Sequence, residues 1–430
     1  MDTIDLPKIQ SAQHRIADLV HKTPCLASAA LSERCAMRLL LKLETLQHTG
    51  SFKPRGALNK ILQLGDDEKG RGVIAASAGN HAQGVAFAAR RAGVESLIVM
   101  PEATPLVKIV NTEALGARVE LHGQNLDESL ERARQLEAEQ GFIFVHPFDD
   151  PAVIAGQGTV GLELLDQVPE VDAIVSPIGG GGLMSGVATA VKALQPGVEL
   201  FGVQSETAPS MKRSFDTNRW QEAEVGATIA EGIALKRPGQ ITQPIIQNLV
   251  DGIELVSEAE IEAAVYELLE VGKTLTEGAG AAGYAALRQG RLPNLRDKTV
   301  VVILCGANID MNILDRIIER SLLQQHRLVR LRITISDRPG GLARLLELVA
   351  EQKANILHIH QNRVFTEAAF WEVDAELILE TRNREHIDQL LRALHQADYP
   401  HVEEIDRRII PAPRSRSLTG RILAPRLEPK

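Results

Sequence analysis

The sequence predicts an α/β protein whose C-terminal part is a separate, ferredoxin-like βαββαβ domain. Up to about residue 320, short apolar runs alternate with amphipathic stretches, which is typical of buried parallel strands covered by helices. Beyond that point the apolar runs give way to strictly alternating ones, which is typical of sheets buried on one face only. A chain of 430 residues is also long enough for two or three domains.

Five apolar runs in the first part are expected to be buried strands, because each is bounded by Gly, Pro or polar residues. They are residues 72–77, 95–100, 173–178, 199–204 and 299–305. Helical periodicity lies between them, most clearly at 126–140 and 259–275. Repeated strand–helix–strand units of this kind predict a sheet with helices on both faces.

The second part begins with the run VRLRITI, in which apolar residues alternate with Arg or Thr. We expect a strand at 329–335, a turn and helix at 337–354, strands at 355–364 and 370–380, a helix at 384–399 and a strand at 401–406. In the strand at 370–380, Trp371 is expected on the apolar face together with Val373. The order βαββαβ is ferredoxin-like, and the change of pattern places a domain boundary at 320–328.

Composition and charge exclude several classes of function. The formal net charge of -9 argues against nucleic acid or an anionic membrane as a partner, and an aromatic content of 3% argues against surfaces that stack on bases. The three cysteines form no CxxC pair, which disfavours a zinc site and a disulfide framework. No apolar run reaches membrane-spanning length and no signal peptide is evident, so we expect a cytoplasmic protein.

Four consecutive glycines, Gly179–Gly182, join the apolar run at 173–178 to a helical stretch. Glycine backbone lets several N–H groups converge on one anion, and the positive end of a helix adds to their attraction. One helix end supplies only about 0.3–1 kcal/mol, so several donors must share the anion. The spacing fits neither the dinucleotide fingerprint nor an NTPase loop. Because four glycines cost too much chain entropy for a turn alone, we predict a phosphate site.

Lys53 lies in the segment SFKPRG, directly before a predicted helix. Pro54 disfavours helical geometry at Lys53 and suits the first helical position. The lysine is therefore expected at a helix N-terminus, where the positive end of the dipole lowers its pKa and favours a neutral, nucleophilic amine. A lysine of this kind is usually a solvated loop residue, so it gains significance only together with the other motifs.

Two more motifs follow predicted strands, at the edge where ligands of open α/β sheets bind. The loop SAGNHAQG begins at Ser77 and offers backbone N–H groups to a carboxylate. His81 within it is expected to pack beneath the loop, because no second metal ligand lies near it in the sequence. Cys305 ends the run at 299–305, although a buried cysteine is often only structural.

The motifs SFKPRGA, SAGNHAQG, IGGGGL and CGANID, in this order and spacing, resemble those of the fold-type-II pyridoxal-phosphate enzymes, and among them the threonine dehydratases, or threonine ammonia-lyases. The resemblance covers about residues 5–320. DRPGGLARLLELVAEQKANI resembles the start of an ACT domain, a module that senses amino acids. The implied fold has a catalytic domain at 1–320 made of two open α/β subdomains (the smaller at about 45–150), an ACT-like domain at 328–408 and a basic Pro/Arg/Ser tail at 409–430.

The resemblance implies a role for each matching residue. Lys53 would hold pyridoxal 5'-phosphate as a Schiff base and, once freed, would remove the Cα proton of an amino-acid substrate. The cofactor would be contacted by Phe52, by Asn80 at the ring hydroxyl, by Cys305 at the ring nitrogen, and at the phosphate by Gly179, Gly180, Gly181, Gly182 and Leu183. The substrate carboxylate would be bound by Ser77, Ala78, Gly79, Asn80 and His81. A neutral partner such as Cys305 favours loss of the β-hydroxyl, so threonine would give 2-oxobutanoate and ammonia, and serine would give pyruvate.

An ACT-like domain implies control by an amino-acid effector, for which isoleucine or valine is the candidate. Its site would be lined by Asp337, Gly340, Gly341 and Asn355. Such modules commonly pair, so we expect a homo-oligomer, a dimer or a tetramer; a purely structural dimerisation domain is the alternative. Relatives with a divalent-cation site carry a carboxylate where Gln204 falls, so we predict no metal.

Two other functions stay open. A serine racemase or hydroxyaspartate dehydratase would share Lys53 and the glycine loop, and a racemase needs a second acid or base, for which Ser77 is the candidate. A silent amino-acid sensor would keep the fold without the chemistry. The complete set of Lys53, Asn80 and the four glycines argues against a silent sensor.

Overall fold

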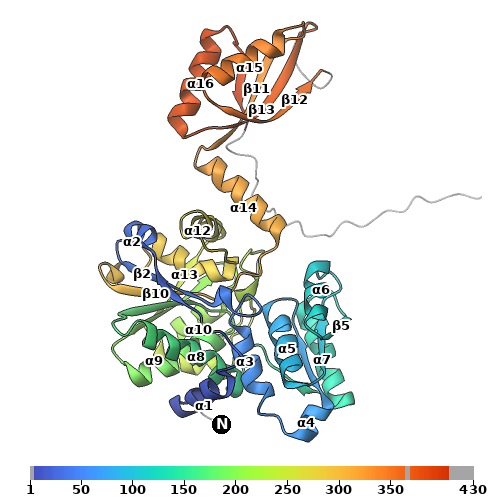
Figure 1. Cartoon of the computed structure of the whole chain (residues 1–430), viewed down its shortest axis with the longest axis vertical. Helices are drawn as coiled ribbons and strands as arrows, with labels where there is room; N and C mark the ends of the chain where they lie inside the picture. The colour runs from blue at the N-terminus through green and yellow to red at the C-terminus, as the bar shows by residue number, and fades with distance from the viewer. Residues whose placement is uncertain (1–3, 364–368, 406–430) are drawn as a thin grey trace, which may run out of the picture. The chain divides into compact units, whose positions relative to one another are not determined.

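The structure, a computed structural model, describes residues 4–363 and 369–405. The chain divides into two compact units between residues 318 and 319. Each unit has its own sheet structure and its own buried core (Figure 1). The predicted tail at 409–430 lies outside the described residues, as do residues 406–408 at the end of the predicted ACT-like domain.

In its described residues, the first unit contains two sheets. The larger has the order β1-β2-β10-β7-β8-β9, in which β1 is antiparallel to β2 and the other pairs are parallel. Its strands are β1 (Cys25–Ala27), β2 (Arg38–Leu43), β7 (Ala173–Pro177), β8 (Glu199–Ser205), β9 (Gly252–Val256) and β10 (Thr299–Leu304). The smaller sheet is wholly parallel, with the order β5-β4-β3-β6. Its strands are β3 (Val73–Ala76), β4 (Ser96–Met100), β5 (Arg118–Leu121) and β6 (Ile143–Phe144).

Helices cover both sheets, and Figure 1 shows α5, α6 and α7 grouped around the smaller one. The helices between β2 and β6 are α3 (Lys53–Ile61), α4 (Asp66–Arg71), α5 (Asn80–Ala92), α6 (Leu106–Ala114) and α7 (Leu126–Gln140). The others are α1 (Leu6–Ile16), α2 (Ala29–Cys35), α8 (Pro151–Gln167), α9 (Gly182–Leu194), α10 (Ser210–Thr217), α11 (Thr242–Leu249), α12 (Glu258–Glu270) and α13 (Gly278–Arg288). Helix α14 (Met311–Gln324) contains the division between the two units. Short 3-10 turns are η1 (Glu44–Leu46), η2 (Glu231–Ile233) and η3 (Pro293–Leu295). Side-chain caps fix several starts: Asn125 accepts from the N–H of Glu128 at α7, and Ser257 and Glu260 form a capping box at α12.

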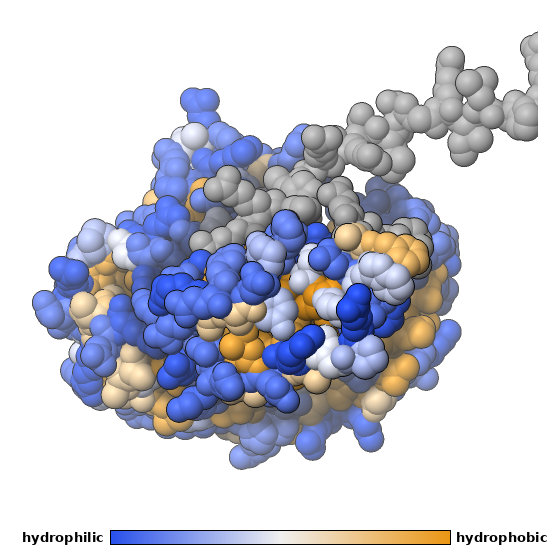
Figure 2. Space-filling view, turned by 90° about the horizontal axis from the view of Figure 1, so that it is seen from above, coloured by the Kyte–Doolittle hydropathy of each residue, from blue (hydrophilic) through white to orange (hydrophobic). Residues whose placement is uncertain are grey.

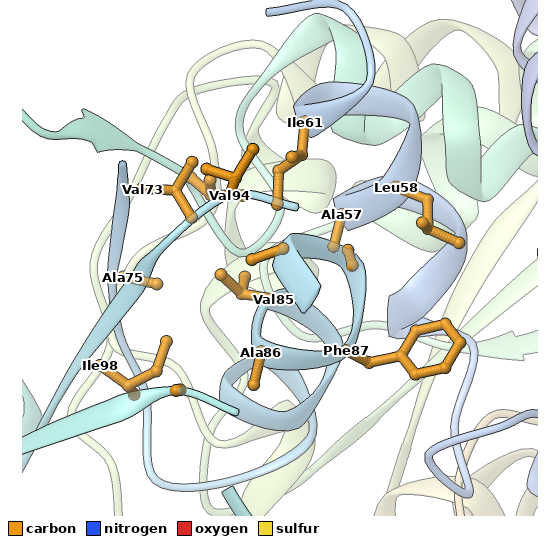
Figure 3. Close-up of a cluster of buried hydrophobic side chains, with 14 of the residues drawn as sticks. Ala57, Leu58, Ile61, Val73, Ala75, Val85, Ala86, Phe87, Val94 and Ile98 are labelled. Atoms are coloured by element: carbon orange, nitrogen blue, oxygen red, sulfur yellow. The ribbon is translucent and has the colours of Figure 1, made fainter. Parts of the chain in front are cut away.

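The core of the smaller subdomain holds the helix that carries Lys53. Aliphatic side chains from α3, α5, β3 and β4 meet there (Figure 3). Ile61 from α3, Val85 from α5 and Ile98 from β4 are all fully buried. Burying a side chain of this size stabilises the fold by about 1.5–3 kcal/mol, so this cluster sets the position of α3.

The second unit has one antiparallel sheet with the order β12-β13-β11-β14, which confirms the predicted ferredoxin-like pattern. Its elements are β11 (Leu328–Ser336), α15 (Gly341–Glu351), β12 (Asn355–Asn362), β13 (Glu372–Glu380), α16 (Arg384–Gln396) and β14 (Val402–Glu404). Alternate residues of β11 and β13 are buried, as expected. The prediction for Trp371 was wrong: β13 begins one residue later, and Trp371 is 64% exposed in the preceding turn.

Other expectations differ from the structure at element ends. The helix predicted at 259–275 stops at Glu270, because Gly272 and Lys273 follow and the backbone of Lys273 is left-handed (φ 53). Hydrophilic residues predominate on the face drawn in Figure 2, where hydrophobic ones form small patches. Among the described residues, none of the helices is both long and apolar enough to span a membrane.

Candidate active site

The sequence motifs meet at one cavity of about 360 Å³. The segments that follow β3, β7 and β10 line it, so it lies at the carboxyl ends of strands from both sheets, where open α/β proteins bind ligands. Its lining includes Phe52, Lys53, Ser77, Ala78, Gly79, Asn80, His81, Gly179, Gly180, Gly181, Gly182, Leu183 and Cys305. The structure therefore brings together all the residues predicted for the cofactor and the substrate carboxylate.

Lys53 enters this cavity from the first residue of α3. Pro54 occupies the second helical position, where its missing N–H costs nothing, so the expectation that Pro54 keeps Lys53 out of the helix was wrong. The Nζ of Lys53 donates to the carbonyl oxygen of Pro147 at 2.8 Å and lies 5.1 Å from the ring centroid of Phe52. Burial lowers the pKa of Lys53 to about 8, although the charges of Cys305 and Glu277 act in the opposite direction. A substantial fraction of the amine is therefore neutral at physiological pH.

The glycines at 179–182 form a cradle at the cavity, and side chains at these positions would collide with neighbouring residues. A Cβ on Gly180 would lie 2.4 Å from the ring of Phe148, and Gly181 has a left-handed backbone with φ 98. Because α9 begins at Gly182, its first N–H groups have no acceptor within the helix. No described residue accepts from the N–H groups of residues 179–183. This donor set fits a phosphate group.

A second group of side chains surrounds Asn80. Its Nδ2 donates to Oε1 of Glu277 at 2.7 Å, and its Oδ1 accepts from Nδ2 of Asn308. These two bonds fix the amide plane and leave one N–H of Asn80 for a ligand. Burial raises the pKa of Glu277 to about 7, against the opposing effect of the bond from Asn80. Burial also raises the pKa of the Cys305 thiol well above its usual range, so this group stays neutral.

The loop from Ser77 to His81 offers fewer donors than its length suggests. The N–H of Ser77 bonds to Val99 O at 3.1 Å, and that of Gly79 bonds to Oγ of Ser77 at 3.2 Å. The N–H groups of Ala78, Asn80 and His81 have no acceptor in the described part of the chain. Since α5 begins at Asn80, these groups form a small anion site at a helix N-terminus.

His81 is buried beneath this loop, as the sequence suggested. Its Nε2 bonds to the carbonyl oxygen of Val145 at 2.8 Å, and since a carbonyl only accepts, Nε2 carries the proton. Burial and the nearby charge of Lys53 lower the pKa of His81 to about 3. The ring is therefore neutral near pH 7 and does not serve as an acid there.

Sequence reasoning missed several residues of the cavity lining, among them Lys108, Pro147, Phe148, Glu231 and Glu277. Lys108 on α6 and Glu231 on η2 form an ion pair of 2.7 Å between the two subdomains. Such residues reach the cavity only through tertiary structure. Among these residues, Glu277 could have been noticed in the sequence, because it is a carboxylate directly before the glycine-rich start of α13.

The residues predicted for the effector do not form one group within a chain. Asp337, Gly340 and Gly341 share the turn between β11 and α15, where Asp337 binds Arg363 at 3.1 Å. Asn355 begins β12 and pairs with Glu380, whereas the turn follows the end of β11 that pairs with position 372. Positions 372 and 380 lie at opposite ends of β13, about 26 Å apart at the usual rise per residue.

Gln204 stands at the position where relatives with a divalent-cation site carry a carboxylate. Its Oε1 accepts from the backbone N–H of Lys212 at 2.8 Å. Across residues 4–363 and 369–405, three or more His, Cys, Asp or Glu side chains never gather as they would around a metal ion.

Comparison with known proteins identifies the family. The profile of the pyridoxal-phosphate dependent enzymes matches residues 16–306. The chain belongs to this family. An ACT domain profile matches residues 329–398. The chain is 45% identical over 396 residues to the L-threonine ammonia-lyase of Thermotoga maritima, covering 92% of this chain and 98% of that protein. A second L-threonine ammonia-lyase, from Geobacter sulfurreducens, is 45% identical over 391 residues and covers 91% and 97%.

Solved structures of the same fold include a deaminase and a racemase. The processed form of threonine deaminase isoform 2 from Solanum lycopersicum is 36% identical with a TM-score of 0.71, covering 74% of this chain and 87% of that one. Maize serine racemase is 34% identical with a TM-score of 0.70, covering 74% and 99%. The residues of this chain fit pyridoxal phosphate: the cradle at 179–183 offers N–H donors to the phosphate, and Lys53 offers a neutral amine to the aldehyde.

Proposed function

We propose that this chain eliminates the β-hydroxyl of L-threonine, and of L-serine, as water. Hydrolysis of the released enamine takes up one water and gives ammonia with 2-oxobutanoate or pyruvate, so that the net loss is ammonia. The observation that carries the proposal is the joint placement of Lys53, the glycine cradle and the neutral thiol of Cys305 around one cavity. Full-length similarity to L-threonine ammonia-lyases supports the choice of substrate.

Different residues of the chain accept the proton, orient the amine and bind the substrate carboxylate. When bound, pyridoxal phosphate supplies an electron sink for the charge that develops at the substrate Cα. The amine of Lys53, whose pKa burial lowers to about 8, accepts the Cα proton. The carbonyl of Pro147 orients this amine, and the N–H groups at the start of α5 bind the substrate carboxylate. Cys305 is a neutral thiol and offers no carboxylate to hold a proton on the ring nitrogen, which favours rapid loss of the β-hydroxyl over transamination.

The test is release of 2-oxo acid from a panel of β-hydroxy amino acids by the reconstituted protein. We expect threonine and serine to react, and Lys53→Ala to abolish the release. Lys22→Ala, which changes a lysine at an exposed ion pair, is the control and should keep it. A fully loaded protein that released no 2-oxo acid from either substrate would refute the proposal.

Serine racemisation is the second candidate, because the chain resembles maize serine racemase in structure. It requires another acid or base besides Lys53, and we propose Ser77, whose Oγ accepts from the N–H of Gly79 and which lines the cavity. Chiral analysis of L-serine after incubation distinguishes the two reactions. In that case Ser77→Ala should remove D-serine formation and leave pyruvate formation in place.

We also propose that the ACT domain controls this reaction by binding an amino acid, isoleucine or valine, at the turn formed by Asp337, Gly340 and Gly341. Asn355 can complete such a site only from a second copy of the chain, because it lies at the far end of its own sheet. Leu357 and Ile359 support pairing, since both are more than 40% exposed on the edge strand β12. Sedimentation with and without each amino acid, alongside activity, tests this, and a monomer with flat titrations would contradict it.

A further inference from the structure

The segment from His146 to Asp150 carries the chain from the smaller subdomain back to α8. It touches the cofactor site at two points: the carbonyl of Pro147 accepts from Lys53, and the ring of Phe148 lies against Gly180. The next two residues are aspartates. Asp150 caps α8, its own helix, by accepting from the N–H groups of residues 152 and 153.

Asp149 instead binds the start of α11, about 90 residues further along the chain. Its Oδ2 accepts from the N–H of Gln240 at 2.8 Å, and its Oδ1 accepts from the N–H of Ile241 at 2.9 Å. Gln240 and Ile241 directly precede α11, and the N–H of Thr242, the first residue of the helix, also donates to Oδ1 of Asp149 at 3.3 Å. The N–H groups of the first helical turn have no acceptor within the helix, so Asp149 supplies one. A Cβ on Gly239 would lie 2.3 Å from Oδ1 of Asp149, so the close approach requires glycine there.

The start of α11 in turn holds the glycine cradle. The hydroxyl of Thr242 donates to the carbonyl oxygen of Gly180 at 2.5 Å, and the N–H of Gly239 donates to the same oxygen at 3.2 Å. The C=O and N–H of one trans peptide unit point in opposite directions. Fixing the Gly180 carbonyl toward α11 therefore turns the N–H of Gly181 away from α11, and Gly181 lines the cavity.

We propose that Asp149 is a positioning residue for the cofactor phosphate: it anchors the start of α11, which orients the peptide between Gly180 and Gly181. The inference rests on the cofactor and its phosphate cradle, and it holds whichever amino acid is the substrate. It predicts an effect on binding of the phosphate alone, because the hydrogen bonds of Asp149 go to residues 240–242 and that of Lys53 goes to Pro147.

The test compares two ligands of the apoprotein by equilibrium dialysis, pyridoxal phosphate and pyridoxal, which lacks the phosphate. In Asp149→Ala we expect the dissociation constant of pyridoxal phosphate to rise about tenfold, the size of an ordinary helix-cap loss, and that of pyridoxal to stay within about twofold. Asp150→Ala is the matched control: it removes the neighbouring cap and an ion pair with Lys60, and should change neither constant.

A second variant keeps the test decisive if Asp149→Ala does not fold. Thr242→Val removes only the hydroxyl bond to Gly180. It should raise the dissociation constant of pyridoxal phosphate and leave that of pyridoxal nearly unchanged. In the double variant the loss of pyridoxal phosphate binding free energy should be smaller than the sum of the two single losses, because both substitutions act on the Gly180 carbonyl. Equal weakening of both ligands, unchanged binding, or an equal effect of Asp150→Ala would each overturn the proposal.

Discussion

Arg55 provides the strongest test of what holds Lys53 in place, because it lies two residues further along α3 and is fully buried. Its guanidinium binds Glu44 at 2.8 and 2.9 Å and Glu163 at 2.6 and 2.9 Å. Burial alone would raise the pKa of Glu44, but the charge and hydrogen bonds of Arg55, together with the charge of Lys42 and the bond from Thr23, outweigh burial and lower the pKa. Glu44 is therefore a buried carboxylate whose charge Arg55 compensates.

Arg55→Met should leave that carboxylate without its main partner. Removing one member of a buried ion pair costs about 3–5 kcal/mol of unfolding free energy. Arg38→Met is the control, because Arg38 pairs with Glu170 at the surface with both side chains more than half exposed. The loss of such a pair costs at most about 1 kcal/mol.

Urea unfolding followed by circular dichroism measures both costs, with the first unit and the ACT domain treated as separate transitions. The folded-state pKa of Glu44 lies below its unfolded value, so its stabilisation is present at neutral pH and is lost as pH falls through the acid range. Arg55→Met should lose this acid-dependent part. A cost for Arg55→Met no larger than that for Arg38→Met would refute the reasoning.

Three further predictions concern the cavity. Gly180→Ala places a Cβ 2.4 Å from the ring of Phe148, so the dissociation constant of pyridoxal phosphate should rise at least about tenfold; unchanged binding would contradict the cradle. The rate at which apoprotein takes up pyridoxal phosphate should rise with pH and level off above about 8, the lowered pKa of Lys53, in stopped-flow absorbance; a rise that continued towards 10.5 would show an ordinary lysine. Because burial raises the pKa of Glu277 from 4.5 to about 7, its carboxyl binds a proton more tightly in the folded state, and the unfolding free energy should fall as pH rises through that window. Glu277→Gln should remove this fall, and a Gln variant with the same pH dependence would contradict the assignment.

Local patterns predicted most of the fold because burial in this chain follows strand and helix periodicity. The strands at 173–177 and 299–304 are mostly apolar runs, and nearly all their residues are buried, on both faces, as such runs predict. Strand β2 was missed because Arg38 and Lys42 interrupt its apolar residues. Trp371 was misplaced because alternation alone does not show where a strand begins.

The site was predictable only as far as its residues fall into short motifs. Lys53, Asn80, the glycine run and Cys305 each belong to one, and all line the cavity. The groups that tune them come from elsewhere in the chain: Glu277 is 197 residues from Asn80, and Pro147 is 94 residues from Lys53. The predicted cause of the lowered pKa of Lys53 was also wrong: we expected the helix dipole, but burial is the largest cause.

The most direct test of the central claim is to locate the lysine that carries the cofactor. Borohydride reduction of the reconstituted protein makes the link permanent, and peptide mass spectrometry then finds it. We expect the phosphopyridoxyl group on the peptide that contains Lys53. Its presence on Lys108, the other lysine among the cavity-lining residues of the described chain, with Lys53 unmodified, would contradict the assignment.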